Sequence, residues 1–273
     1  MMVTRRAFLK SAIAVGTGVI AGTGLHGYQY ARRALELTRA TVPVRGLSTG
    51  LNGLTIGLLT DVHRSQWVSD EDVRAATDLL MTAHPDLIVL GGDYVSFADR
   101  RYMRAAAEAL SRLTAPHGVF AVLGNHDDDR EMPAALQAQG VEVLRDVRTR
   151  RTIRGEHLEL AGIRFWTRRA TDISAVLRGT RGPVVLLAHD PRRIAEASAL
   201  SVPVVLSGHT HGGQVVLPIA GAIAARKFRT LAGLAEQDGT TLFVSRGVGT
   251  VYVPVRLNCP PEVAVLTLRP ADA

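Results

Sequence analysis

The chain is poor in the residues that stabilise small disulfide-rich domains or structural zinc sites. Its 273 residues include a single cysteine, Cys259, which excludes an internal disulfide framework and a zinc site built from thiolates. Aromatic residues make up only 5% of the sequence, but apolar residues make up 47%. At this length the chain can therefore bury a large core, as one large domain or two small ones.

Acidic residues are almost absent from the first 40 positions. That stretch holds six basic residues and one acid, whereas the remainder holds 26 basic and 24 acidic residues, a net charge of +2. The overall charge of +7 therefore comes mainly from the N-terminus. A nearly neutral domain lacks the basic surface typical of proteins that bind long nucleic acids, so we expect no nucleic-acid partner.

The N-terminus also lacks an apolar run long enough to be an obvious membrane span. Residues 11–25 form a Gly- and Ala-rich run of fifteen residues, shorter than the roughly 20 that a spanning helix needs. A basic stretch precedes this run, which is the layout of an export signal. Its pair Arg5-Arg6, followed by Phe8, Leu9 and Lys10, resembles a twin-arginine signal, which carries folded proteins across the bacterial inner membrane.

We therefore expect residues 1–40 to be a twin-arginine-type export signal or membrane anchor with a linker, and residues 41–273 to be the functional domain. The expected partner is the twin-arginine translocation machinery, and the expected location is periplasmic or otherwise extracytoplasmic, with membrane association. The site Ala21-Gly22-Thr23 is a possible cleavage point, and an uncleaved, tethered form is the alternative.

From about residue 50 onward, short β-branched runs alternate with helical patterns. Strands are expected at 54–60, 87–90 and 118–123, and again near 184, 202, 241 and 263. Helices are expected from Ser69, the predicted N-cap, to residue 81 and over 102–113. A charged segment at 145–154 indicates a solvated hairpin. The pattern predicts an α/β fold with two packed β-sheets flanked by helices, in four layers ordered α/β/β/α.

Polar side chains follow five of these strands at the point where each strand ends. They are Asp61 and His63, then Asp93, then Asn125, His126 and Asp127, then His189, and finally His209 and His211. The carboxyl ends of strands in open α/β sheets are where ligands bind, so we expect these side chains to converge on one crevice. In an extended chain, residues two apart share a face, which would bring each Asp-x-His or His-x-His pair to one site.

These side chains offer carboxylate, amide and imidazole donors. Such a set suits a pair of divalent transition-metal ions, namely manganese, iron or zinc. Two ions held close together can activate a water molecule and bind a phosphoryl group. Taken alone, the His209-x-His211 pair could also be two surface histidines in a polar loop.

The blocks DVH, GGD, GNHD, AHDP and SGHTHGGQ, in this order, resemble those of the calcineurin-like metallophosphoesterases. The block GHTHGGQ and the late segment SRGVGT…PVRLNCPPEVAVLTL look like the exported, membrane-associated bacterial branch of YkuE-like and YaeI-like phosphodiesterases. The resemblance covers roughly residues 50–270. It implies a phosphodiesterase with a binuclear metal centre, whose relatives include enzymes acting on nucleotide-linked lipids such as UDP-2,3-diacylglucosamine. We expect it to act as a monomer.

The resemblance also implies roles for single residues. Asp61, His63 and His211 would hold one ion, Asn125, His189 and His209 the other, and Asp93 would bridge the two. His126 would face the scissile phosphate, where it would stabilise charge or protonate the leaving oxygen.

One position departs from the family pattern. Many members carry G-D-x-x-D, in which the second Asp orients the catalytic histidine, but here Ser96 takes that place. A serine cannot stabilise an imidazolium as a carboxylate does. Asp127 or Asp99 could take over this role, which makes Asp127 a second catalytic candidate beside His126.

Two other functions fit the same sequence. A non-catalytic binding or scaffold protein on this fold would be expected to lose ligands, whereas all seven candidate ligands and His126 are present. An exported nuclease or nucleotidase is the third possibility. The near-neutral domain argues against long polyanionic substrates but not against mononucleotides.

Overall fold

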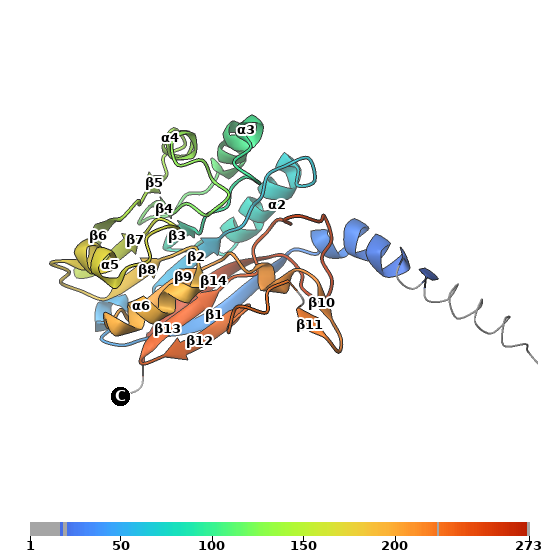
Figure 1. Ribbon diagram of the computed structural model, residues 1–273. Helices are drawn as coiled ribbons and strands as arrows, with labels where there is room; N and C mark the ends of the chain where they lie inside the picture. Colours follow the sequence, from blue (N-terminus) through green and yellow to red (C-terminus); the bar gives the residue numbers. More distant parts are fainter. Residues whose placement is uncertain (1–16, 19–20, 223, 272–273) are drawn as a thin grey trace, which may run out of the picture.

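The computed structural model describes residues 17–18, 21–222 and 224–271. Two six-stranded sheets lie face to face, with helices on both outer sides (Figure 1). In spatial order, the first sheet contains β1 (Glu36–Val44), β14 (Glu262–Pro270), β2 (Thr55–Leu59), β3 (Leu87–Leu90), β4 (Val119–Ala121) and β5 (Glu142–Val143). The second contains β12 (Gly233–Gln237), β13 (Thr240–Val244), β9 (Val204–Ser207), β8 (Val184–Leu187), β7 (Glu156–Gly162) and β6 (Val147–Ile153).

The helices complete the four layers that the sequence predicts. Helices α2 (Asp70–Met81), α3 (Arg100–Leu110) and α4 (Glu131–Gln137) cover the first sheet, and α5 (Ala170–Leu177) and α6 (Ile194–Ala199) cover the second. A short hairpin of β10 (Val216–Leu217) and β11 (Gly221–Ala222) lies outside both sheets. The predicted hairpin near 145–154 is present as the antiparallel pair β6 and β7.

The strands are apolar on both faces because each sheet is covered on both sides. Ile56 and Leu58 of β2 point into the core between the sheets, while Leu59 packs toward the helices. Phe243 of the second sheet faces the same inter-sheet core from the opposite side. This double burial explains why the sequence shows continuous apolar runs rather than strict alternation.

Local capping fixes the start of α2 as the sequence predicts. The Ser69 hydroxyl accepts a hydrogen bond from the Asp72 amide at 3.2 Å, and the Asp72 carboxylate accepts one from the Ser69 amide at 2.9 Å. Helix α3 begins two residues earlier than expected, because the Asp99 side chain caps it by accepting from the Arg101 amide.

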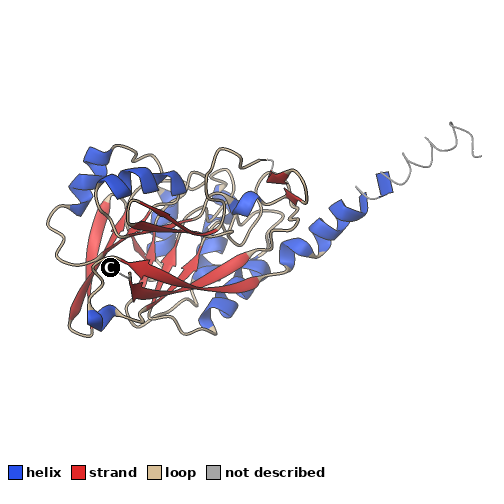
Figure 2. Ribbon diagram, turned by 90° about the horizontal axis from the view of Figure 1, so that it is seen from below, coloured by secondary structure: helices blue, strands red, loops and turns tan. Residues whose placement is uncertain are grey.

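The N-terminal part of the described chain is a helix that projects from one end of the domain (Figure 2). Among the described residues, no helix is both long and apolar enough to cross a bilayer. The Arg5-Arg6 pair lies outside the described residues. The predicted division at residue 40 falls within β1, whose nine residues pair with β14 from Glu36 onward. The folded sheet therefore begins upstream of the expected boundary.

Candidate metal centre

The polar residues at the five strand ends do converge, and they come from both sheets. Asp61 and His63 follow β2, Asp93 follows β3, Asn125 and His126 follow β4, His189 follows β8, and His209 and His211 follow β9. Strands β2, β3 and β4 run parallel in the first sheet, and β8 and β9 run parallel in the second. Their carboxyl ends meet at one edge, where the two sheets pack together.

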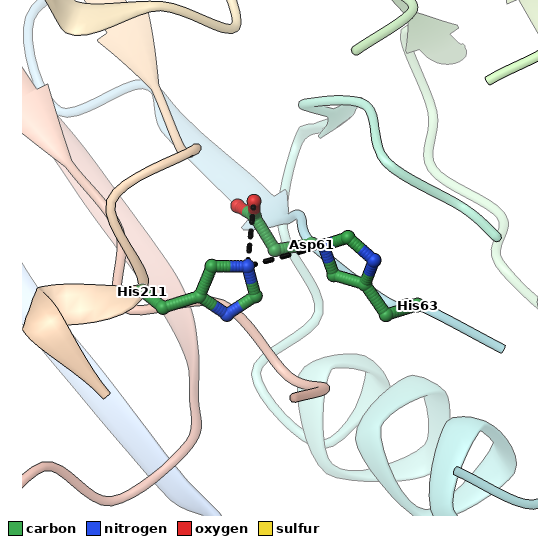
Figure 3. A group of neighbouring side chains, drawn as sticks. All are labelled: Asp61, His63 and His211. Carbon is green, nitrogen blue, oxygen red and sulfur yellow. Dashed lines mark hydrogen bonds and ion pairs between the residues drawn. The ribbon is translucent and has the colours of Figure 1, made fainter. Parts of the chain in front are cut away.

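One group of possible metal ligands consists of Asp61, His63 and His211 (Figure 3). The Nε2 atoms of the two histidines are 3.1 Å apart, and His211 Nε2 lies 3.4 Å from Asp61 Oδ1. All three residues are buried. Three donor atoms that face one point within this spacing could hold one divalent ion.

A second group consists of Asp93, His189 and His209. Asp93 Oδ2 lies 3.1 Å from His189 Nε2 and 3.4 Å from His63 Nε2, so this oxygen contacts one histidine of each group. That position is the one a carboxylate must take to be shared by two ions.

A further observation supports the binding of divalent ions at this site. Asn125 Oδ1 is buried and has no hydrogen-bond partner among the described residues. A buried polar atom without a partner is costly, so it indicates a missing ligand at that point. The donor set of carboxylate, amide and imidazole suits manganese, iron or zinc.

The backbone at the ligands is not extended, contrary to the expectation from strand geometry. Five of the seven candidate ligands have positive φ values, between 48° and 73°: Asp61, His63, Asp93, His209 and His211. These residues lie in left-handed turns after the strands, a conformation that is uncommon outside glycine and often found at functional sites. His209 and His211 accordingly belong to different groups instead of sharing one face.

Two glycines allow the backbone to approach the carboxylates closely. A Cβ atom at Gly124 would lie 2.0 Å from Asp93 Oδ1, and one at Gly208 would lie 2.1 Å from Asp61 Oδ2. Any side chain at these positions would displace the carboxylates.

The charge state of the site follows from burial and proximity. Burial alone would raise the pKa of Asp93, but His189 and His63 hold it well below its usual value. Burial would lower the pKa of His189, but Asp93 and Asp61 raise it to about 10. Burial and the neighbouring His189 lower the pKa of His209 to about 3. At neutral pH His209 is therefore ready to bind metal, whereas His189 would release a proton on binding.

His126 lines the same cavity. A backbone amide contacts its ring, in place of the carboxylate that the family pattern led us to expect. The backbone N–H of Phe97 donates to its Nδ1 at 3.0 Å, so the ring proton of the neutral imidazole lies on Nε2. Burial lowers the pKa of His126, which favours this neutral form.

Neither acid proposed to orient His126 contacts its ring. The Asp127 carboxylate accepts hydrogen bonds from the amides of Asp93, Tyr94 and Gly124, at 2.7 to 2.9 Å. It ties together the loops after β3 and β4, and burial and Asp93 raise its pKa to about 7. Asp99 caps α3. The structure therefore places the Asp127 carboxylate against loop amides and not against the His126 ring that it was expected to orient.

Ser96, which replaces the orienting carboxylate, contacts a metal ligand instead. Its Oγ lies 3.1 Å from His63 Nδ1, which leaves His63 Nε2 facing the other ligands. A hydrogen bond of this kind fixes the tautomer and ring orientation of a metal-binding histidine.

A cavity of about 370 Å³ opens over both groups and over His126. Its far wall carries residues that the sequence motifs did not indicate, among them Lys227, Phe228, Val251 and Tyr252. Gln214, the last residue of the GHTHGGQ block, joins the two loops of this wall through bonds with Val251 and Val253. No periodicity or motif marks the loop residues as part of the site.

Comparison with known proteins agrees with this geometry. Residues 54–213 match the model of the calcineurin-like phosphoesterase family. The chain is 30% identical to the uncharacterized metallophosphoesterase YkuE of Bacillus subtilis, over 97% of this chain and 98% of that protein. It is 31% identical to phosphodiesterase YaeI of Escherichia coli, over 98% of this chain and 100% of that protein.

Among solved structures, the fold is similar to that of the Haemophilus influenzae NAD nucleotidase, with a TM-score of 0.52 and 14% identity. That alignment covers 71% of this chain and 45% of the nucleotidase. With the family match over more than half of the sequence and two possible metal groups at the sheet edge, the chain belongs to the calcineurin-like metallophosphoesterases and is a metal-dependent phosphoric ester hydrolase.

Proposed function

We propose that this protein hydrolyses phosphodiesters and that one ester arm of its substrate is a lipid. The observation that carries the first part is the position of Asp93, whose Oδ2 contacts a histidine of each ligand group. Two ions held in this way would supply Lewis acidity to the phosphoryl oxygens and lower the pKa of a water molecule. The similarity to a relative named as a phosphodiesterase supports a diester rather than a monoester.

His126 contributes a hydrogen-bond donor to this reaction. Its Nδ1 accepts from the Phe97 amide, so a second proton on Nδ1 would face another N–H group. The ring therefore stays neutral and points Nε2–H into the cavity, where it stabilises negative charge that develops on the phosphoryl or leaving oxygen. Of the two roles implied by the family resemblance, this geometry favours charge stabilisation over proton transfer.

The shape of the cavity supports an apolar substrate arm. The apolar wall of the cavity is formed by Val215 before the β10–β11 hairpin, by Ala225 and Phe228 after it, and by Val251 and Val253 of a separate loop. Lys227 is a charged residue on this wall that could pair with a phosphate oxygen. An apolar wall beside a phosphate-binding floor fits a lipid-linked diester, of which UDP-2,3-diacylglucosamine is one example.

A substrate panel tests the proposed function. The metal-loaded protein should cleave nitrophenyl phosphodiesters with a higher kcat/KM than nitrophenyl phosphate. Its kcat/KM should also rise with the length of an alkyl arm, by about two- to fourfold per methylene while the arm stays within the cavity. UDP-diacylglucosamine, glycerophosphodiesters and teichoic-acid fragments complete the panel. A preference for the monoester, or no dependence on chain length, would refute the diester or the lipid part respectively.

The shared role of Asp93 is tested by metal content. Asp93→Ala removes the carboxylate that contacts both groups, so the variant should lose both divalent ions and all measurable turnover. Asp99→Ala is the matched control, because it removes a nearby carboxylate that caps α3 and pairs with Arg101 but belongs to neither ligand group. Elemental analysis of both variants gives the answer. A full complement of two ions in Asp93→Ala would contradict the bridging position.

The role of His126 is tested by two substitutions. His126→Ala should keep both ions but lose kcat by on the order of 10²- to 10³-fold, as when an oxyanion donor is removed. His126→Gln should recover much of this loss, because an amide can accept from Phe97 and donate into the cavity but cannot transfer a proton. Turnover is measured on nitrophenolate and alkoxide leaving groups. If Gln were as slow as Ala on the alkoxide substrates, proton transfer would be required and the donor role would be wrong.

We propose also that the protein is exported in its folded state and remains at the membrane. The basic pair Arg5-Arg6 before an apolar run supports this. Changing both arginines to lysine should leave active protein in the cytoplasm, because twin-arginine recognition needs the pair. Fractionation with an activity assay measures this. Unchanged export of the double variant would favour a simple anchor instead.

A further inference from the structure

Exposed apolar side chains gather at one end of the domain. Ten large apolar side chains are exposed among the described residues, and seven of them lie on the N-terminal helix and its end or on loops around the cavity mouth. These seven are Leu25, Tyr30, Trp67, Phe97, Ile219, Tyr252 and Val253. A cluster of exposed apolar side chains on a protein surface marks a site of contact with a partner or a membrane.

Four of these residues form one surface beside the active-site opening. Trp67, Phe97, Tyr252 and Val253 line a single pocket of about 430 Å³. Tyr252 and Val253 also line the metal-site cavity, so the pocket adjoins the reaction centre.

The N-terminal helix lies against the same surface. The rings of Tyr28 and Trp67 are 6.4 Å apart, and the Arg32 guanidinium donates to the Trp67 carbonyl at 2.5 Å. Gly27 is buried against Val255 and Arg256. The helix therefore packs beside the aromatic pocket.

The β10–β11 hairpin completes the surface, and the segment that follows it carries positive charge. Ile219, in its connection, is fully exposed at 102%. Figures 1 and 2 both place this hairpin at the same end of the molecule as the N-terminal helix. Three exposed basic residues follow the hairpin: Arg226, Lys227 and Arg229. Lys227 also lines the cavity. Positions 197–235 contain no acidic residue.

We propose that this surface docks onto an anionic lipid bilayer and turns the cavity mouth toward the lipid. Tyrosine and tryptophan favour the interface between water and lipid, and aliphatic side chains such as Ile219 enter it. The basic residues complement anionic headgroups. The acid in the aromatic pocket, Asp99, is paired with Arg101 at 2.6 Å and so does not oppose this contact.

A docked orientation would let a lipid-linked diester move from the bilayer into the cavity without crossing water. In this respect the inference rests on the proposed substrate class, but docking itself does not depend on it. The two can be tested apart, because vesicle binding needs no turnover.

The charge contribution is tested with full-length protein and vesicles of phosphatidylglycerol mixed with phosphatidylcholine. Each basic residue near an anionic surface contributes about fivefold in affinity, so Arg226→Ala with Arg229→Ala should weaken binding on the order of 20- to 30-fold. Ile219→Ser should weaken it about tenfold. Both variants should hydrolyse a soluble nitrophenyl diester at the wild-type rate.

The matched control removes two positive charges at the opposite end of the second sheet. Arg154, in the turn between β6 and β7, and Arg181, just before β8, are exposed and lie at the strand ends away from the site. Arg154→Ala with Arg181→Ala should leave vesicle binding nearly unchanged. Equal weakening by both double variants would overturn the proposal, because only net charge would then matter.

The two tryptophans of the chain provide a second, independent measurement. Trp166→Phe leaves Trp67, which lies on the proposed docking surface, as the sole tryptophan, and Trp67→Phe leaves Trp166, in the connection from β7 to α5. Brominated lipid chains should quench Trp67, which lines the aromatic pocket, more strongly than Trp166, which packs against Phe165 beside His209 and lines neither pocket.

Three outcomes would overturn the docking surface: no quenching of Trp67, equal quenching of both tryptophans, or a lipid-independent dimer that the Ile219→Ser variant abolishes. Failure of the proposed function would look different. The protein would then bind vesicles through this surface but cleave no diester.

Discussion

The buried Asp93 carboxylate is the group on which the rest of the site depends. Only 2% of this residue is exposed, and a carboxylate removed from water needs cations or hydrogen-bond donors around it. One oxygen contacts His63 and His189, which belong to different sheets, and the other accepts the His126 amide at 2.8 Å. The loops after β2, β3, β4 and β8 must therefore be held together before this charge can be buried.

The same constraint explains why Asp127 holds the loops together instead of orienting the His126 ring. Its carboxylate receives three backbone amides, including that of Asp93, and so fixes the loop that aims Asp93 at the histidines. His126 is left with an amide partner, Phe97. A carboxylate in that place would stabilise an imidazolium, whereas an N–H group stabilises the neutral ring. The structure thus gives His126 an N–H partner that favours the neutral ring and leaves Ser96 beside the metal ligand His63.

Much of this site could be predicted from the sequence because its strands are buried on both faces. Continuous apolar runs such as 87–90 end abruptly at polar residues, and those ends are where the ligands lie. The backbone at the ligands could not be predicted, since the left-handed turns at Asp61 and His211 are set by tertiary contacts and not by residue type. Strand β1 is not among the strands expected from the sequence pattern, because it is held in place by pairing with β14 from the far end of the chain. Composition does not reveal a pairing between segments that lie far apart in the sequence. The basic residues near β1 also resemble those of the leader.

Each ligand group spans the interface between the sheets. Asp61 and His63 come from the first sheet but His211 from the second, and Asp93 comes from the first sheet but His189 and His209 from the second. Neither sheet alone can hold an ion, so metal binding and sheet packing stabilise one another. A translocation route that threads unfolded chains would separate the ligands and release the ions. A route that carries folded proteins keeps the two sheets together, which is why the proposed twin-arginine export and a metal centre built across two sheets are physically compatible.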